Sequence, residues 1–350
     1  MSTDPARVLE SLRASPGWFL HQLDLAGERA LLVALTPAEI RAAAFLDERV
    51  LGGNRAGFWA PLPRVLAALG AATAGPPHAI FHIGHCGSTL LSRLLDGIPG
   101  TLGLREPLPL RTLAALREEL ASPLARLDAT QWQAHFDALL AALARRPAGI
   151  EHVVVKATSS ANALIAPWLA HDDARAVLLS VRLVPYLATI LKSASARSDA
   201  LTFAAARLGA LHALVGDDEL RLPPLTAAER IALGWIAELA RFDAARRSHA
   251  AQALALDFDD FLAWPARSLA AVAAHLRLAH DEATIASALD PGVLGSYAKA
   301  TDHAYDAAAR AADLAESQRR FRDEIDAGLR FAERTIARYP SLAALGALLS

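Results

Sequence analysis

Cysteine is almost absent from this chain. Cys86 is the single one among 350 residues, which excludes an intramolecular disulfide framework and is typical of a reducing compartment. An excess of basic residues is also missing, because the formal net charge is −2 and the isoelectric point about 6.6. No charge-free apolar run approaches the length of a bilayer span, and the first ten residues carry charges where a signal peptide would be apolar. These absences predict a soluble, cytoplasmic protein with neither nucleic acid nor membrane partners.

Short apolar runs alternate with helical segments along the chain. Apart from the first run, each leads toward a helix, and continuous apolar runs suit a parallel sheet covered on both faces. We therefore expect a doubly wound α/β domain over residues 76–350, with residues 1–75 as an α-rich extension that holds one strand and packs on the core. The Ala-Gly-Pro-Pro stretch at 74–77 marks the junction. The predicted strands are 30–35, 79–83, 153–155, 176–181 and 253–256.

Three capping-box patterns predict where helices begin. Thr36 with Glu39 predicts a helix that runs to about Glu48. Thr226 with Glu229 opens a long helix to about Arg246, and Thr130 with Gln133 opens one that ends near Arg146.

The segment 78–96 is the most informative. It consists of a short buried strand, a loop of small residues at 84–88 and an amphipathic helix from Thr89. Such a loop gathers backbone N–H groups at the positive end of a helix dipole, where a phosphate or sulfate group binds. The triphosphate-binding pattern G-x-x-x-x-G-K-S/T would need glycine at His82 and lysine at Ser88. The sequence therefore predicts an anion-binding loop that is not an ordinary ATP or GTP site.

Polar residues follow the predicted strands, where ligands lie in open α/β sheets. Lys156 and Arg182 each come directly after an apolar run, and Glu106 follows a short hydrophobic stretch. The group Asp257–Asp260 follows the last strand, and we interpret it as a helix cap and turn. Hydroxyls at Thr189 and Ser193 lie beyond Arg182, and Lys299 lies in a late loop.

Together these residues resemble the sulfotransferase superfamily. The residues around Gly87 are similar to its 5′-phosphosulfate loop, whose usual form is P-K/R-S-G-T-S/T-L-L. The segments that end in Lys156 and Arg182, and the segment 253–262, resemble three later segments of the family in the same order. In the loop, the residues at the family's six positions are, in order, Gly84, His85, Cys86, Gly87, Ser88 and Thr89.

The resemblance implies a P-loop-type α/β fold and an enzyme that transfers a sulfuryl group. The donor would be 3′-phosphoadenylyl sulfate and the acceptor a small-molecule hydroxyl or amine, with in-line displacement, release of adenosine 3′,5′-bisphosphate and no metal. The loop would hold the 5′-phosphate, and Arg182 the 3′-phosphate. Thr189 or Ser193 would be the nearest hydroxyl, and Lys156 and Lys299 would also contact the donor. Glu106 is the candidate base, and His85 the candidate leaving-group acid.

Each assignment has a structural alternative. Cys86 is more typical of a small buried residue than of a nucleophile, and Lys156 and Arg182 are also compatible with solvated charges at strand ends. Glu106 is equally suited to pair with Arg105 or Arg111. His78, His82, His85 and Cys86 lack a second ligand pair, so no metal site is expected. Two other functions stay open: a P-loop enzyme that acts on another nucleotide, and a sulfotransferase-fold protein that binds without turnover.

Overall fold

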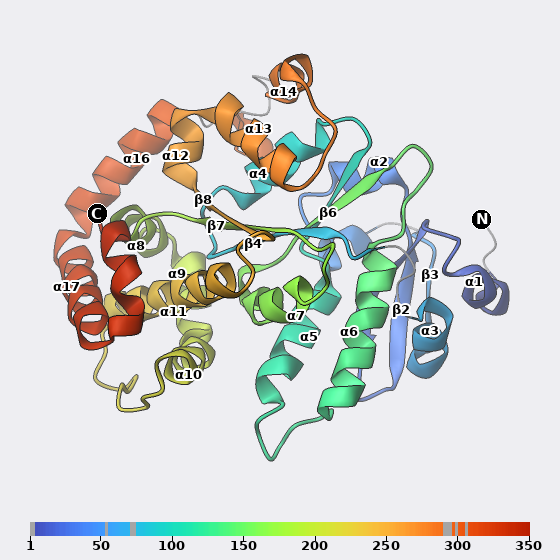
Figure 1. The fold of residues 1–350 in the computed structure, drawn as a ribbon, viewed down its shortest axis with the longest axis horizontal. Helices are drawn as coiled ribbons and strands as arrows, with labels where there is room; N and C mark the ends of the chain where they lie inside the picture. Colours follow the sequence, from blue (N-terminus) through green and yellow to red (C-terminus); the bar gives the residue numbers. More distant parts are fainter. Residues whose placement is uncertain (1–3, 53–54, 71–74, 290–295, 298–299, 305–306) are drawn as a thin grey trace.

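A five-stranded parallel sheet forms the centre of the protein (Figure 1). The computed structural model describes residues 4–52, 55–70, 75–289, 296–297, 300–304 and 307–350. The strand order is β5-β6-β4-β7-β8, so the chain leaves β4 toward one edge and then returns past it toward the other. This reversal confirms the expected doubly wound α/β architecture. The strands are β4 (His78–His82), β5 (Thr101–Arg105), β6 (His152–Lys156), β7 (Ala176–Ser180) and β8 (Ala253–Asp257).

Helices cover both faces of this sheet, as continuous apolar strands require. In Figure 1, the helices above the sheet are α4 (Ser88–Asp96), α12 (Phe258–Ala263), α13 (Pro265–His275) and α14 (Glu282–Ala288). Those below it include α5 (Leu108–Glu119), α6 (Ala129–Leu143), α7 (Ile165–Leu169) and α11 (Ala227–Ser248), with the 3-10 helix η2 (Ser159–Leu164) before α7. Trp132, Trp168 and Trp235 are fully buried in this layer.

The remaining helices of this part pack around α11 and α8. α17 packs on both α11 and α8, and α16 packs on α8. Among the described residues, no helix has the length and apolar character that crossing a membrane requires. These elements are α8 (Leu183–Leu191), α9 (Ala194–Thr202), α10 (Ala204–Val215), α16 (Ala307–Arg320), α17 (Arg322–Arg338), the 3-10 helix η3 (Pro340–Leu348), and the paired strands β9 (Ser296–Tyr297) and β10 (Ala300–Ala304).

The N-terminal part contains more strand than the sequence predicts. Instead of one strand it forms a three-stranded antiparallel sheet, β1-β2-β3. It packs on the core, and the Arg145 guanidinium after α6 donates to the carbonyls of Leu12 at 2.7 Å and Ser15 at 3.1 Å. The division at residue 75 stays a prediction. The elements are α1 (Pro5–Ser11), β1 (Trp18–Asp24), β2 (Arg29–Ala34), α2 (Pro37–Ala42), η1 (Glu48–Leu51), β3 (Gly57–Pro61) and α3 (Leu62–Leu69).

The capping patterns give two correct helix starts. Thr36 and Thr226 form complete capping boxes, and the latter opens α11 as predicted. The box at Thr130 is wrong, because Asp128 caps α6 together with Gln131. The predicted end of the first helix is also wrong, because α2 ends at Ala42. The buried Arg105 guanidinium donates to the carbonyls of residues 40, 41 and 43, so these carbonyls do not serve as acceptors for a further helical turn.

Candidate functional site

The loop between β4 and α4 is built from left-handed residues. Gly84, His85 and Gly87 have φ values of 87°, 52° and 76°, so three of four consecutive positions lie in the region that favours glycine. This conformation turns the chain sharply from the end of β4 into α4, which begins at Ser88. The first backbone N–H groups of α4 lack acceptors within the helix, so the loop concentrates donors at a helix N-terminus.

Two side chains close the loop from the sides. A Cβ atom at Gly87 would lie 1.9 Å from Cε2 of Phe258, so the ring of Phe258 packs directly on this glycine. A Cβ at Gly84 would lie 3.4 Å from the Ser159 hydroxyl. The side chain of Thr89 is buried, and its Oγ1 has no hydrogen-bond partner in the part of the chain that the structure describes. The loop therefore has side chains packed closely against its glycines and a buried Thr89 hydroxyl without a hydrogen-bond partner among the described residues.

Buried hydrogen bonds fix the strand end below the loop. His82 accepts from the Gly84 backbone N–H through Nδ1 at 3.0 Å, so its proton is on Nε2, which donates to the Ala157 carbonyl at 2.8 Å. Asn162 Nδ2 donates to the His82 carbonyl at 3.1 Å and to Glu238 Oε2 at 2.9 Å. His82 is thus a structural histidine that orients Gly84. No sequence pattern pointed to Asn162 or Glu238, since the bonds join segments far apart in the chain.

Cys86 and His85 occupy opposite environments in the loop. Cys86 is fully buried, and its thiol lies 3.4 Å from the Leu179 carbonyl as a donor. His85 is exposed. Because a buried thiol in apolar surroundings is a poor nucleophile, the loop offers His85 rather than Cys86 to a ligand.

Glu106 and Lys156 form an ion pair at the ends of β5 and β6. The two strands are neighbours, and the Glu106 backbone N–H donates to the Lys156 carbonyl at 2.8 Å. Lys156 Nζ donates to Glu106 Oε1, while Arg111 Nη2 lies 3.8 Å from Oε2. The lysine side chain is 1% exposed and the carboxylate 12% exposed. Of the two partners proposed for Glu106, Arg111 is confirmed, whereas Arg105 pairs with Asp96 instead.

Arg182 lies at the end of β7, across β4 from Lys156. Its side chain is 45% exposed, and Nη2 is 3.9 Å from Asp260 Oδ1. Nη1 donates to the Ser350 carbonyl at 3.5 Å. Both contacts are long, so the guanidinium is held loosely at the surface.

The two candidate hydroxyls already have backbone partners. Thr189 Oγ1 donates to the Pro185 carbonyl at 2.8 Å, and Ser193 Oγ accepts from Ala196 N at 3.2 Å as the N-cap of α9. Lys299 lies outside the residues that the structure describes.

The acidic group after β8 is a helix cap, as interpreted from the sequence. Asp257 caps α12 and accepts from the backbone N–H groups of Asp259 at 2.8 Å and Asp260 at 3.2 Å. Burial raises the pKa of Asp257, and its Oδ2 has no partner among the described residues.

The sheet brings most of these residues to one edge. β6, β4 and β7 are adjacent and parallel, so Lys156, the loop and Arg182 all lie at the carboxyl ends of neighbouring strands. The edge thus places the exposed Arg182 and the buried, paired Lys156 on either side of a helix N-terminus. The arginine and the helix N-terminus together suit a ligand with two separated anionic groups.

No family model and no curated protein matches this chain. Among solved structures it is similar to a sulfotransferase from Mycobacterium avium, with 15% identity, a TM-score of 0.40 and coverage of 91% of this chain and 97% of that one. It is also similar to a sulfotransferase domain from the curacin biosynthetic pathway, with 15% identity, a TM-score of 0.39 and coverage of 67% and 85%. A sulfotransferase from Mycobacterium tuberculosis H37Rv has 19% identity, a TM-score of 0.37 and coverage of 73% and 78%.

All of these neighbours are sulfotransferases, and the likeness concerns the fold. Since each TM-score is below 0.5, we base the functional proposal on the geometry of the carboxyl edge.

Proposed function

We propose that this protein is a sulfotransferase-like enzyme that transfers a sulfuryl group from 3′-phosphoadenylyl sulfate to a hydroxyl or amine of a small-molecule acceptor. The loop between β4 and α4 is the main support. Its left-handed residues Gly84, His85 and Gly87 gather backbone N–H donors at the N-terminus of α4. The Thr89 hydroxyl is buried without a partner among the described residues. A phosphate oxygen satisfies such donors well.

Different residues of the carboxyl edge would bind the two phosphate groups of 3′-phosphoadenylyl sulfate. The backbone of Cys86 to Thr89 and the Ser88 and Thr89 hydroxyls would hold the 5′-phosphate. Arg182 would hold the 3′-phosphate, because a guanidinium binds phosphate bidentately and its contact with Asp260, at 3.9 Å, is weak enough to exchange.

A hydroxyl near Arg182 would complete the 3′-phosphate site. The Ser193 oxygen accepts from Ala196 N, which leaves its own proton to donate to Ser195 or to a phosphate oxygen. The Thr189 proton is already given to the Pro185 carbonyl. Ser193 therefore suits this role better than Thr189. Lys299 stays a proposed donor contact from the sequence.

Glu106 and Lys156 would serve the transfer itself. As the bond between the acceptor oxygen or nitrogen and sulfur forms, the bond from sulfur to the bridging oxygen breaks, and the acceptor proton passes to the Glu106 carboxylate. Lys156 has three donors, so it can orient Glu106 and also face the sulfuryl oxygens. His85, exposed in the loop, would give a proton to the leaving bisphosphate.

The same ion pair favours a second candidate, a protein of this fold that binds the nucleotide without turnover. Glu106 is bracketed by Lys156 and Arg111, so the carboxylate that would take the acceptor proton is already held by two cationic side chains. An enzyme that uses ATP or GTP is disfavoured because Ser88 stands where such a loop has its lysine.

A thermal-shift comparison tests the nucleotide preference that both candidates share, and single-turnover transfer separates the enzyme from the binding protein. We expect adenosine 3′,5′-bisphosphate to raise the Tm of the protein, ATP and GTP to have little effect, and Arg182→Ala to reduce the shift. Arg247→Ala is the control, since Arg247 is an exposed arginine on α11. A preference for ATP or GTP would overturn the proposal, and no response to any of the three nucleotides would favour a different ligand.

A further inference from the structure

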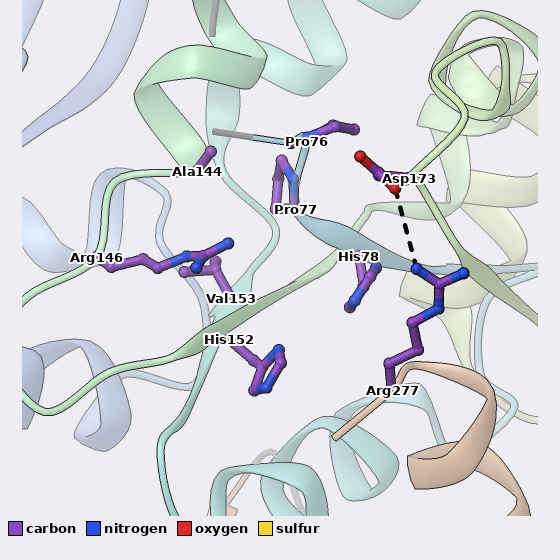
Figure 2. Close-up of a pocket in the computed structure, with 10 residues that line it drawn as sticks. Pro76, Pro77, His78, Ala144, Arg146, His152, Val153, Asp173 and Arg277 are labelled. Atoms are coloured by element: carbon purple, nitrogen blue, oxygen red, sulfur yellow. Dashed lines mark ion pairs between the residues drawn. The ribbon is translucent and has the colours of Figure 1, made fainter. Parts of the chain in front are cut away.

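A polar cavity lies at the edge of the sheet opposite the loop. Its volume is 210 Å³, and it opens where β4 and β6 begin, so it is one strand length away from the loop (Figure 2). Pockets for drug-sized ligands are about 300–1,000 Å³, so this one suits a smaller molecule. The mechanism proposed above uses none of its residues. The polar side chains of its lining are those of His78, Arg146, His152, Asp173 and Arg277.

Cationic groups surround the cavity. Figure 2 shows Arg146 and Arg277 on either side of two imidazoles, His78 and His152, which stack with ring centroids 6.4 Å apart at an interplanar angle of 18°. The carboxylate in the lining, Asp173, is 3.9 Å from Arg277 Nη1. Two arginines therefore face one carboxylate, and the lining keeps a positive balance even with both imidazoles neutral.

His78 has an unsatisfied nitrogen at this place. Its Nδ1 is buried and has no hydrogen-bond partner within the described ranges. Burial, together with the positive charges of His152, Arg175, His275 and Arg277, lowers the pKa of His78 to about 4. Burial and Arg146 also lower the pKa of His152, and the smaller effect of Glu151 raises it. Burial and the nearby cations thus keep both imidazoles neutral at pH 7, and an anion bound beside them would favour their charged forms.

We infer that this cavity binds a small tetrahedral oxyanion, phosphate or sulfate, at a site separate from the loop. Arg146 and Arg277 supply charged donors, and His78 Nδ1 gains a partner when it carries a proton. A bound dianion reverses the local field, so anion binding and His78 protonation favour each other, and binding tightens as the pH falls. The inference does not depend on the proposed function.

Nuclear magnetic resonance of the histidine ring signals tests the inference at the site itself. Inorganic phosphate is titrated into the full-length protein, with potassium chloride at equal ionic strength as the reference, and His78→Asn and His152→Asn assign the signals. We expect a saturable shift of both signals with phosphate and a rise of the His78 pKa by about one unit or more. Because the readout is at His78, phosphate bound in the loop does not imitate it.

Matched arginine variants make the test sharper. Arg277 and Arg247 are equally exposed at 59%, and each pairs with an aspartate, but only Arg277 lines the cavity. Arg146→Gln and Arg277→Gln should weaken apparent phosphate affinity about tenfold or more, and Arg247→Gln should leave it unchanged. Signals that respond to phosphate as they do to chloride would overturn the inference. So would a saturable response that neither cavity variant weakens.

Discussion

The two edges of the central sheet differ in how their charged side chains are paired. At the carboxyl edge, Lys156 is paired with Glu106, and the left-handed loop leaves backbone and hydroxyl donors for a ligand. At the amino edge, a buried side-chain nitrogen of His78 lies among cations without a hydrogen-bond partner in the described residues. The comparison teaches that a cation at a strand end is not by itself a ligand site. A candidate site needs in addition a buried donor or acceptor without a partner among the described residues, as Thr89 has at one edge and His78 at the other.

The largest expected effect is at the loop. Gly87→Ala should abolish bisphosphate binding and lower the free energy of unfolding by about 3 kcal/mol or more, because the new methyl collides with Phe258 in a left-handed position. Gly149→Ala is the control: its φ of 79° is nearly the same, but nothing lies within 4 Å of the added atom. It should cost only about 1 kcal/mol. Equal losses in urea denaturation would show that the contact with Phe258 is unimportant.

Glu106→Gln should separate binding from chemistry at the carboxyl edge. Loss of the base should reduce sulfuryl transfer about 100-fold or more, while the affinity for bisphosphate changes little. Glu118→Gln is the control, since Glu118 pairs with Arg241 outside the site. Single-turnover transfer from labelled donor measures the rate. Unchanged transfer would leave Glu106 only its structural role as the partner of Lys156.

His85→Arg should change the shape of the pH profile more than its height. An imidazole can lose its proton as the pH rises, whereas a guanidinium stays charged, so wild-type transfer should fall toward high pH and the variant profile should be flat. The measurement is kcat from pH 6 to 9. Identical profiles for the two proteins would remove His85 from the mechanism.

At the amino edge the readout is stability. The pKa of His78 is lowered to about 4, so between about pH 6.5 and 4 the unfolded chain takes up a proton that the folded protein does not. Wild-type stability should therefore fall as the pH falls through this window. His78→Asn should lessen that loss by on the order of 2 kcal/mol in urea denaturation. His135→Asn, on α6, serves as the control, and equal slopes for wild type and His78→Asn would contradict the account.

Asp257→Asn should have the smallest effect. Asparagine also caps helices, and burial raises the pKa of Asp257, so ionisation at neutral pH disfavours the folded state. The sign follows: wild type loses stability as the pH rises through the raised pKa, and the variant does not. We expect the variant to match or exceed wild type at pH 7 by a few tenths of a kcal/mol. A loss above about 1 kcal/mol in chemical denaturation would show that the charge is needed for the cap.

The sequence was sufficient for four of the five strands of the main sheet. These four are nearly continuous apolar runs, and such runs signal burial on both faces. β5 was missed because Thr101, Gly103 and Arg105 interrupt it, and Arg105 is buried only because Asp96 and three distant carbonyls receive its donors. β1 and β3 were missed because their partner, β2, has to be in place before their edges are satisfied.

The candidate site was predictable as a set of strand ends but not as a set of contacts. Lys156, Arg182 and the loop at Gly87 follow apolar runs, which is a local signal. The pairing of Lys156 with Glu106 depends on β5 lying beside β6, and the contact of Phe258 with Gly87 joins positions 171 residues apart. Neither is visible in a local pattern.

The most direct test of the loop and Arg182 together is a calorimetric titration. Adenosine 3′,5′-bisphosphate and adenosine 5′-monophosphate differ only in the 3′-phosphate, so their comparison isolates the contribution assigned to Arg182. The account predicts one bisphosphate per chain, bound about tenfold tighter than the monophosphate or more, with the preference lost in Arg182→Ala. Equal affinities in wild type, or tighter binding of ATP than of the bisphosphate, would contradict it.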